Sequence, residues 1–368
     1  MNIITVNDLP LTPTITFPSL VTTDTVVIGA GQAGLAAAYY LQQSQVDFRL
    51  LDAAPTAGAA WAARYDSLRL FSPAWASGLP GRAWPGNPLR YPTRDETTAY
   101  LRDYAAHFSF PLATNQRVTR VVADPDQAGY LVHTADVTYS ARRVIIATGP
   151  FTTPQVPEWA AQLPPAVLHL HSRAYQRPAQ LPGTGPVAVV GSGNSALQIA
   201  ADVATTGRPV VVAFDEKTPA LFNNQLMWLG LTLTGLLRVS RHSALGARLF
   251  GRPEPVVSGD LARLRGFANA TFIGRALGAL PTGALHGQGA TSAPVGAVVW
   301  ATGYRPGYGW VELPIFTADG RPRHHRGLTA APGVAFLGLD WLDTRRSALL
   351  NGAGADARRV VAELLTMP

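Results

Sequence analysis

The stretch TVVIGAGQAG, residues 25–34, decides the fold of this chain. Its β-branched opening predicts a buried strand, and its glycines predict a tight turn that leads into a helix. The first glycine permits the turn, the second leaves room for a pyrophosphate against the backbone, and the third packs the helix on the sheet. Residues 35–43 are rich in alanine and predict that helix, and residues 48–52 predict a second strand. This order of elements indicates a Rossmann-like dinucleotide-binding unit.

A second copy of the pattern lies at VAVVGSGNSA, residues 187–196, with an expected helix over 197–204 and a strand over 210–215. Alanine is tolerated at the third glycine position. In both copies a pyrophosphate would rest on unpaired N–H groups at the positive end of the helix. An aspartate, Asp52 or Asp215, ends the second strand, where an acid accepts hydrogen bonds from ribose hydroxyls. One Gly-rich turn is a weak signal, but two complete units predict two bound dinucleotides.

The residues expected to contact these dinucleotides follow from the two patterns. In the first unit they are Gly29, Gly31, Gln32, Ala33, Gly34 and Asp52. In the second unit they are Gly191, Ser192, Gly193, Asn194, Ser195, Ala196 and Asp215.

Two further segments are alike: RVIIATGP, residues 143–150, and AVVWATGYRP, residues 297–306. Each is an apolar strand that ends in Ala-Thr-Gly, and a buried strand stopped by glycine would look the same. We favour the interpretation that the chain crosses between two domains here, close to a cofactor. This interpretation adds Ala147, Thr148, Gly149, Ala301, Thr302 and Gly303 to the expected contacts.

The crossings and the two units together predict an α/β fold of two Rossmann-like dinucleotide-binding domains, one inserted in the other. A length of 368 residues suits two domains. We expect residues 1–155 and 303–368 to form one discontinuous domain and residues 156–302 to form the inserted domain.

The residue types present limit the chemistry. The chain has no cysteine, which excludes disulfide scaffolds, zinc ribbons, iron–sulfur clusters and dithiol redox relays. Its eight histidines show no metal-ligand spacing, so no metal site is expected. A serine-hydrolase elbow is also missing, because Ser192 and Ser195 both belong to the nucleotide turn.

The chain is basic, but without the pattern of a nucleic-acid-binding protein. It has 30 basic and 23 acidic residues, a formal net charge of +7, and a single lysine, Lys217. The arginines are scattered, and no RNA-binding aromatic signature accompanies them. Cofactor phosphates are a better partner for some of this charge, so we expect no nucleic-acid partner.

No targeting or membrane-spanning segment is evident. Residues 1–24 lack the charged region of a signal peptide. Residues 218–237 carry no charge, but polar residues interrupt them, and the remaining apolar run, 226–237, is too short to span a bilayer. We expect this run to form a helical pair in the core or along a pocket, in a cytoplasmic protein. Candidate pocket or core residues are Phe222, Met227, Trp228 and Leu231.

With these patterns the chain resembles the class B flavin-dependent monooxygenases, which bind FAD in the first unit and NADPH in the second. The likeness runs from about residue 25 to residue 364 and is closest to compact bacterial flavoproteins associated with cation efflux. It includes GAAW, residues 58–61, similar to a family motif that contacts FAD, and NGAGADA, residues 351–357.

The resemblance implies FAD and NADPH as cofactors, with NADH as the second choice for the nicotinamide. It makes residues 1–155 and 303–368 the FAD domain and residues 156–302 the NAD(P)H domain. It also adds Ala60, Trp61 and Val118 to the expected cofactor contacts.

Two departures from the family pattern concern catalysis. The family's linker signature is half present: His171 and Tyr175 hold its last two places, but Pro165 and Val167 replace its first residues. His171 would orient a cofactor or substrate across the domain seam, or it is a satisfied linker residue. Where N-oxidising relatives place an asparagine near the flavin, this chain offers Ser72, which also suits an ordinary turn before proline. Ser72 and His171 are the predicted catalytic residues.

A third departure concerns the nicotinamide cofactor. Many NADPH-using relatives carry an arginine after the second strand of the second unit, where this chain has Asp215 and Glu216. Unit charges about 5 Å apart at an effective dielectric near 20 repel by roughly 3 kcal/mol, so an acid there disfavours a 2′-phosphate. Lys217 could offset this repulsion and is a predicted cofactor contact, although chance placement on a surface turn would look the same.

The leading functional hypothesis is a monooxygenase with a small-molecule substrate and O₂ as partners. NAD(P)H would reduce FAD, O₂ would add at C4a, and the peroxyflavin would oxidise an N, S or carbonyl centre. The alternative is an NAD(P)H-dependent reductase or oxidase that passes electrons to a quinone, a partner protein or O₂. A non-catalytic flavin or nucleotide sensor is a third hypothesis. The absence of cysteine excludes disulfide reductases of this architecture, and a homodimer is left open.

Overall fold

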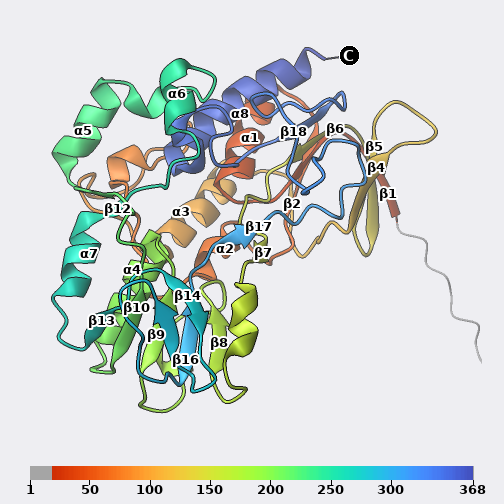
Figure 1. Ribbon diagram of the computed structural model, residues 1–368. Helices are drawn as coiled ribbons and strands as arrows, with labels where there is room; N and C mark the ends of the chain where they lie inside the picture. The colour runs from red at the N-terminus through yellow and green to blue at the C-terminus, as the bar shows by residue number, and fades with distance from the viewer. Residues whose placement is uncertain (1–18, 368) are drawn as a thin grey trace, which may run out of the picture.

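In the computed structural model the chain forms two main β-sheets, and one Gly-rich turn follows a strand of each (Figure 1). The structure describes residues 19–367. Residues 1–18 belong to the expected FAD domain and to the stretch without a signal-peptide pattern, and they lie outside the described residues, as does Pro368.

The first sheet contains the first Gly-rich turn and has the order β3-β2-β1-β6-β5-β4, with β18 also paired to β6. Its neighbours are parallel except in the β4-β5-β6 portion, which is antiparallel. The strands are β1 (Ser19–Ile28), β2 (Phe48–Leu51), β3 (Leu112–Ala113), β4 (Arg120–Ala123), β5 (Tyr130–His133), β6 (Val137–Ile146) and β18 (Val334–Phe336).

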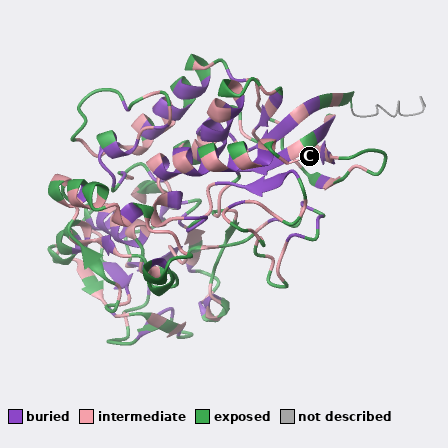
Figure 2. Cartoon of the chain, turned by 90° about the horizontal axis from the view of Figure 1, so that it is seen from above, coloured by how far each residue is buried: buried purple, intermediate pink, exposed green. Residues whose placement is uncertain are grey.

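Three longer helices accompany this sheet: α1 (Gln32–Gln43), α3 (Arg94–His107) and α8 (Leu350–Leu365). Helix α1 packs against α8 and contacts α3, and α3 begins at a capping box formed by Thr93 and Glu96. Figure 2 shows the sheet and the inner helix faces as buried and the outer faces as exposed. The parallel strands of this sheet therefore have the continuous apolar runs that covered faces require.

The second sheet contains the second Gly-rich turn, and all of its neighbouring strands are parallel. Its order is β13-β10-β9-β16-β8. The strands are β8 (Leu168–His171), β9 (Val187–Val190), β10 (Val210–Ala213), β13 (Ala270–Phe272) and β16 (Ala297–Trp300). Helix α4 (Asn194–Ala204) follows the turn and packs against α7 (Ser258–Arg265).

The two crossings between the sheets run side by side. Strand β7 (Thr153–Pro154) carries the chain away from the first sheet, and β17 (Tyr304–Arg305) brings it back. They pair as an antiparallel ladder, Tyr304 with Pro154 and Arg305 with Thr153. The predicted domain boundaries at 155/156 and 302/303 lie next to this ladder and stay predictions.

The remaining elements are short. They are α2 (Ala59–Ala62), α5 (Gln225–Leu233), α6 (Ala244–Leu249), β11 (Ala220–Leu221), β12 (Val256–Val257), β14 (Ala276–Ala279) and β15 (Leu285–Gly287), with 3₁₀ turns η1 (Ala74–Ala76), η2 (Glu158–Gln162), η3 (Pro178–Gln180), η4 (Leu236–Arg238) and η5 (Arg345–Ala348).

The fold class expected from the sequence is confirmed, and the helices begin earlier than the periodicity suggests. Helix α1 begins at Gln32 rather than at residue 35, and α4 begins at Asn194 rather than at residue 197. In both cases the helix starts inside the Gly-rich motif, because the second glycine of each motif is already the N-cap residue.

The expectation for residues 226–237 is wrong in part. These residues do form two helical pieces, α5 and η4, but α5 presents Leu226, Leu229 and Leu233 to the surface and buries only Trp228. Phe222, a candidate core or pocket residue, is also exposed. Among residues 19–367 no helix has the length and apolar character needed to cross a bilayer.

Candidate functional site

The first Gly-rich turn has the geometry that its three glycines predict. Gly29 has φ +106°, in the region that favours glycine. A Cβ on Gly34 would lie 1.8 Å from the carbonyl oxygen of Gly29, so α1 can approach the turn only without one. Around the Cβ position of Gly31 no atom lies within 4 Å, and the start of α1 has no side-chain cap. The N–H groups of this helix end therefore face open space, as an anion site requires.

The second Gly-rich turn repeats this arrangement, and each turn rests against an Ala-Thr-Gly crossing. A Cβ on Gly29 would lie 2.8 Å from the oxygen of Ala147, and one on Gly191 would lie 2.2 Å from the oxygen of Ala301. The N–H of Ala147 donates to Ile28 at 2.8 Å, and that of Ala301 donates to Val190 at 2.8 Å. Both crossings thus lie directly beside the predicted dinucleotide turns.

The two predicted ribose-binding aspartates differ in their surroundings. The carboxylate of Asp52 accepts hydrogen bonds from the N–H groups of Ala30, at 2.6 Å, and Ala54, at 2.8 Å, so it is fixed beside the first turn. The N–H of Asp215 donates to the hydroxyl of Ser192 at 2.9 Å, which joins the aspartate to the second turn. Both aspartates therefore lie beside the Gly-rich turns, and their contact with a ribose stays a prediction.

The surroundings of Asp215 include cations that the sequence did not suggest. Arg275 Nη1 lies 4.0 Å from Asp215 Oδ2, and Arg265 forms an ion pair with Glu216. Lys217 follows on the same turn, and its N–H donates to Asp215 Oδ1 at 3.0 Å. No local pattern could have identified Arg275, because only the pairing of β10 with β13 brings the segment after β13 to this place.

The other expected contacts of the first unit gather around its turn. The indole Nε1 of Trp61 donates to Gln32 Oε1 at 3.1 Å, and Gly58 donates to the oxygen of Ala30 at 3.0 Å. These bonds place α2, which contains Ala60, against the start of α1. Val118 packs against the first core, two residues after Gln116, whose N–H donates to Asp52 O. Ala33 packs against Gly338.

The remaining predicted contacts lie in the two turns and crossings, and several are hydrogen-bonded to neighbouring segments. Tyr308 donates to the oxygen of Gly149, and the hydroxyl of Thr302 donates to Gln155 O. Asn194 Oδ1 accepts from the N–H of Val257, and Ala196 is buried in the second core. The list is completed by Thr148 and Gly303, at the two crossings, and by Gly193 and Ser195, at the start of α4.

His171 lies at the end of β8 and contacts the return crossing. Its Nδ1 accepts from the N–H of Arg173 at 3.1 Å, and its Nε2 is 3.0 Å from the oxygen of Gly303, so Nε2 carries the proton. Burial lowers the pKa of this imidazole, and the positive charges of Arg173 and Arg64 lower it further. The ring is therefore neutral and held against the crossing by two backbone groups. Its catalytic role stays a prediction.

Arg64 joins this crossing to the first half of the chain. Its Nη1 donates to the hydroxyl of Tyr304 at 2.9 Å, and its guanidinium lies 5.1 Å from the ring centre of Phe151. Tyr304 in turn meets the His171 ring edge-on at 5.0 Å. The structure thus brings together a cation, two aromatic rings and a neutral imidazole where the chain passes between the sheets.

Ser72, the other predicted catalytic residue, is buried rather than exposed. Its hydroxyl lies 2.8 Å from that of Ser77, which itself donates to the oxygen of Pro73 at 2.8 Å. The two hydroxyl groups form a small hydrogen-bond network inside the turn. The catalytic role of Ser72 also stays a prediction.

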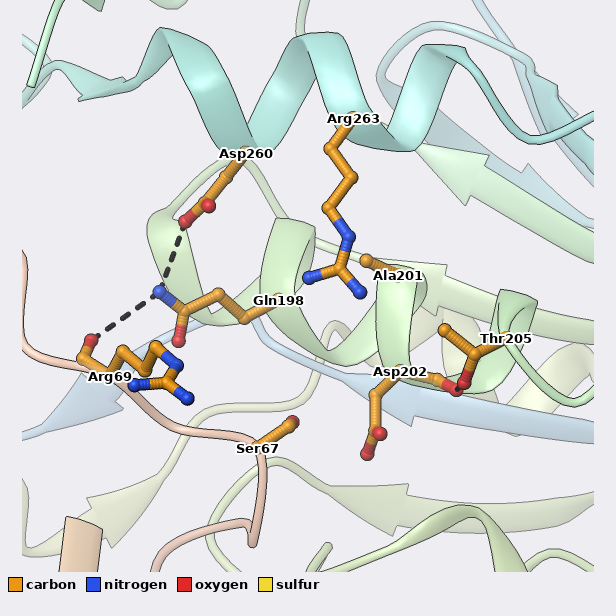
Figure 3. A pocket seen from close by; sticks show the side chains of 8 residues that line it. All are labelled: Ser67, Arg69, Gln198, Ala201, Asp202, Thr205, Asp260 and Arg263. Carbon is orange, nitrogen blue, oxygen red and sulfur yellow. Dashed lines mark hydrogen bonds between the residues drawn. The ribbon is translucent and has the colours of Figure 1, made fainter. Parts of the chain in front are cut away.

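A polar seam joins the first half of the chain to α4 and α7 (Figure 3). The hydroxyl of Tyr65 donates to Gln198 Oε1 at 3.0 Å, and Gln198 Nε2 donates to Asp260 Oδ2 at 3.0 Å. A cavity of about 100 Å³ opens beside them, with Arg69 and Arg263 at its rim. No group of three or more potential metal-ligating side chains occurs within residues 19–367.

Two Gly-rich turns, each set against a strand that leads to the other sheet, define an oxidoreductase that binds two dinucleotides. The chain belongs to the pyridine nucleotide-disulphide oxidoreductase family, which it matches over residues 26–229. It is 37% identical to a CzcO-like oxidoreductase of Geobacillus kaustophilus, over 93% of this chain and 98% of that relative. It is 33% identical to the CzcO oxidoreductase of Bacillus subtilis, over 93% and 99% of the two chains.

The solved structures agree with these sequence matches. A flavin-containing monooxygenase from Stenotrophomonas maltophilia is 32% identical and superposes with a TM-score of 0.76, over 94% of this chain and 98% of that chain. The expected resemblance to the flavin monooxygenases is therefore confirmed, and the chain is a flavin-dependent oxidoreductase. Because it has no cysteine, it lacks the dithiol after which its family is named.

Proposed function

We propose that this protein is a FAD- and NADPH-dependent monooxygenase that oxygenates a small organic molecule at an N, S or carbonyl centre. The observation that carries the proposal is the duplicated geometry of a Gly-rich turn packed on an Ala-Thr-Gly crossing. In this proposal each turn binds one dinucleotide, and the reacting ends of the two would meet where the chain passes between the sheets. With no cysteine to take electrons from a flavin, O₂ and a small substrate are the natural acceptors.

The first unit fits FAD. The uncapped start of α1 and the open space at Gly31 suit a pyrophosphate, and Asp52 suits the adenosine ribose. Trp61 and Gln32 would lie beside the bound dinucleotide. In this proposal residues 1–155 and 303–368 form the FAD domain, and residues 156–302 form the inserted NADPH domain.

The second unit fits a phosphorylated nicotinamide dinucleotide. Glu216 is paired with Arg265, which removes part of the repulsion that an acid would exert on a 2′-phosphate. Arg275 lies 4.0 Å from Asp215 and offsets its charge, and Lys217, on the same turn, adds one more positive charge. These cations support NADPH over NADH.

The residues of this chain would bind and orient the cofactors. Bound FAD would supply hydride acceptance and oxygen activation. His171 and Arg64 would fix the crossing against which the nicotinamide half lies, and Ser72 would keep the loop near the flavin in place through its bond to Ser77. The packed crossings would keep water away from the reacting ends of the cofactors.

The test is anaerobic reduction of the purified yellow protein with NADPH, followed by admission of O₂ and a panel of amines, sulfides and ketones. The proposal expects a transient oxygenated flavin in the absorbance trace and an oxygenated product. Reoxidation without either would reject it. Fast turnover with a quinone or redox-protein acceptor and no product would instead support the reductase alternative, which the basic surface charge favours. The proposed location is the cytoplasm.

A further inference from the structure

Helix α5 presents an apolar face to the surface. Leu226 and Leu233 are 78% and 77% exposed, and Leu229, between them, is about half exposed. Their spacing of three and four residues places all three on one side of the helix, opposite Trp228. At the outer edge of the molecule in Figure 1, α5 thus has one face packed on the protein and the other uncovered.

The segments that flank α5 in the chain also expose large apolar side chains. Phe222 is 79% exposed just before α5, and Leu221 is exposed beside it. Leu245 and Phe250, on and just after α6, are exposed as well. We call these residues, with the three leucines of α5, the α5 surface. A run of exposed large apolar side chains of this kind marks an interaction site.

The α5 surface is held firmly in this orientation. Asn224 caps α5 by accepting from the N–H of Met227 at 2.8 Å. The indole Nε1 of Trp228 donates to Phe71 O at 3.1 Å and to Asn223 Oδ1 at 2.8 Å, and its ring stacks on that of Phe71. These contacts fix the rotation of α5 about its own axis. The three leucines therefore face outwards.

Basic side chains outnumber acidic ones around the α5 surface. Residues 218–254 contain four arginines, Arg238, Arg241, Arg248 and Arg252, and one acidic residue, Glu254, whose Oε1 accepts from Trp341 Nε1 at 3.1 Å. None of the four forms an ion pair with a described residue, and Arg241 lies 5.6 Å from the ring centre of Phe250. An apolar face bordered by unpaired cations complements an apolar layer bordered by anions.

We infer that the α5 surface docks on the surface of a lipid bilayer that contains anionic headgroups. The leucines and phenylalanines enter the boundary between headgroups and acyl chains, and the arginines contact lipid phosphates. A second copy of the chain is a poorer occupant, because a twofold contact would bring the same unpaired arginines together. The nine residues of α5 lie along the bilayer surface and do not cross it.

The test is sedimentation of the FAD-loaded protein with vesicles of phosphatidylcholine alone or mixed equally with phosphatidylglycerol. We expect binding to the mixed vesicles at least about tenfold tighter than to phosphatidylcholine, and release by high salt. The variant Leu226→Gln, Leu229→Gln, Leu233→Gln should bind mixed vesicles at least about tenfold less well. Arg248→Gln with Arg252→Gln should weaken binding by roughly twentyfold.

The matched control is Leu277→Gln with Leu280→Gln, which changes two exposed leucines away from the α5 surface and should leave vesicle binding unchanged. The FAD content of each variant and its rate of NADPH oxidation show whether the variant is folded. The inference is overturned if the wild-type protein does not bind mixed vesicles, or if the control loses as much binding as the α5 variant. It is also overturned if light scattering shows a dimer that the α5 variant dissociates while no vesicle binding occurs.

Discussion

At the scale of single residues, three cations stand near Asp215 and Glu216, but only Lys217 is adjacent to them in sequence. Arg265 and Arg275 reach this place from segments about 50 to 60 residues further on, as their ion-pair contacts show. The sequence could predict the acid at the end of the strand and the lysine after it. It could not predict Arg275, because a parallel strand pairing determines its position and no local periodicity reports that pairing.

Lys217→Ala and Arg275→Ala should therefore each raise the Michaelis constant for NADPH by about fivefold, with little effect on that for NADH. The reason is that, in the proposed site, each substitution removes a positive charge that would face a 2′-phosphate, which NADH lacks. Steady-state rates with both cofactors measure the effect, and Arg321→Ala, an exposed arginine paired with Asp319, serves as the control. Equal effects on the Michaelis constants for both cofactors would show that these residues do not contact the 2′-phosphate.

His324 gives the protein a pH-dependent stability. Its Nδ1 accepts from the N–H of Gly327 at 3.1 Å, which requires an unprotonated nitrogen. Burial lowers the pKa of His324 to about 4, and the charge of Arg241 contributes in the same direction. The unfolded chain, with a pKa near 6.5, binds the proton more tightly, so stability is present above about pH 6.5 and is lost as the pH falls towards 4.

Between pH 7 and pH 5 this group should lower the free energy of unfolding by about 2 kcal/mol. His324→Asn keeps an acceptor for Gly327 but cannot titrate, so this variant should lose correspondingly less stability over the same range. Urea unfolding at both pH values measures the difference. An identical loss in the two proteins would assign the pH dependence to other groups.

At the scale of secondary-structure elements, the strand–turn–helix units could be predicted, because their apolar periodicity and glycines are local signals. The orientation of α5 could not. Nearly every residue from Leu226 to Leu233 is apolar, so the pattern does not distinguish the face that packs from the face that remains exposed. The contacts of Trp228 with Phe71 and Asn223 decide it, and they join segments far apart in the sequence.

The first turn and α1 offer a test that separates folding from cofactor binding. Gly34→Ala should destabilise the protein without cofactor, because its Cβ would lie 1.8 Å from the oxygen of Gly29 and would push α1 away from the turn. Gly31→Ala meets no atom within 4 Å and has an ordinary extended backbone, so it should leave that stability unchanged. Its methyl group would occupy the space proposed for the FAD pyrophosphate.

The measurements are the melting temperature of each apoprotein and the affinity of each variant for FAD. We expect the Gly31→Ala apoprotein to have the melting temperature of the wild type. We expect it to bind FAD at least about tenfold more weakly. Normal FAD affinity in Gly31→Ala would show that the pyrophosphate does not approach the chain at this residue.

At the scale of the whole molecule, the two halves are joined by more than the crossing ladder. Tyr65 comes from the first half of the chain, yet its ring is buried in the core of the second sheet. Burial raises the pKa of Tyr65 to about 12, so its hydroxyl remains a donor to Gln198. The neighbouring Asp66 donates its N–H to Gln176 O at 2.8 Å and pairs with Arg177. These contacts join the part of the chain that contains the first Gly-rich turn to the sheet that contains the second.

Tyr65→Phe should consequently slow flavin reduction by NADPH about fivefold, because Gln198 loses its donor and the seam loosens. FAD content and NADP⁺ affinity should stay at wild-type values, since neither turn is changed. Tyr130→Phe removes a hydroxyl that donates to Pro332 O within the first half of the chain, and it should not alter the rate. Anaerobic stopped-flow absorbance measures all three proteins. If Tyr65→Phe reduces at the wild-type rate, the seam does not set the geometry of hydride transfer and serves stability alone.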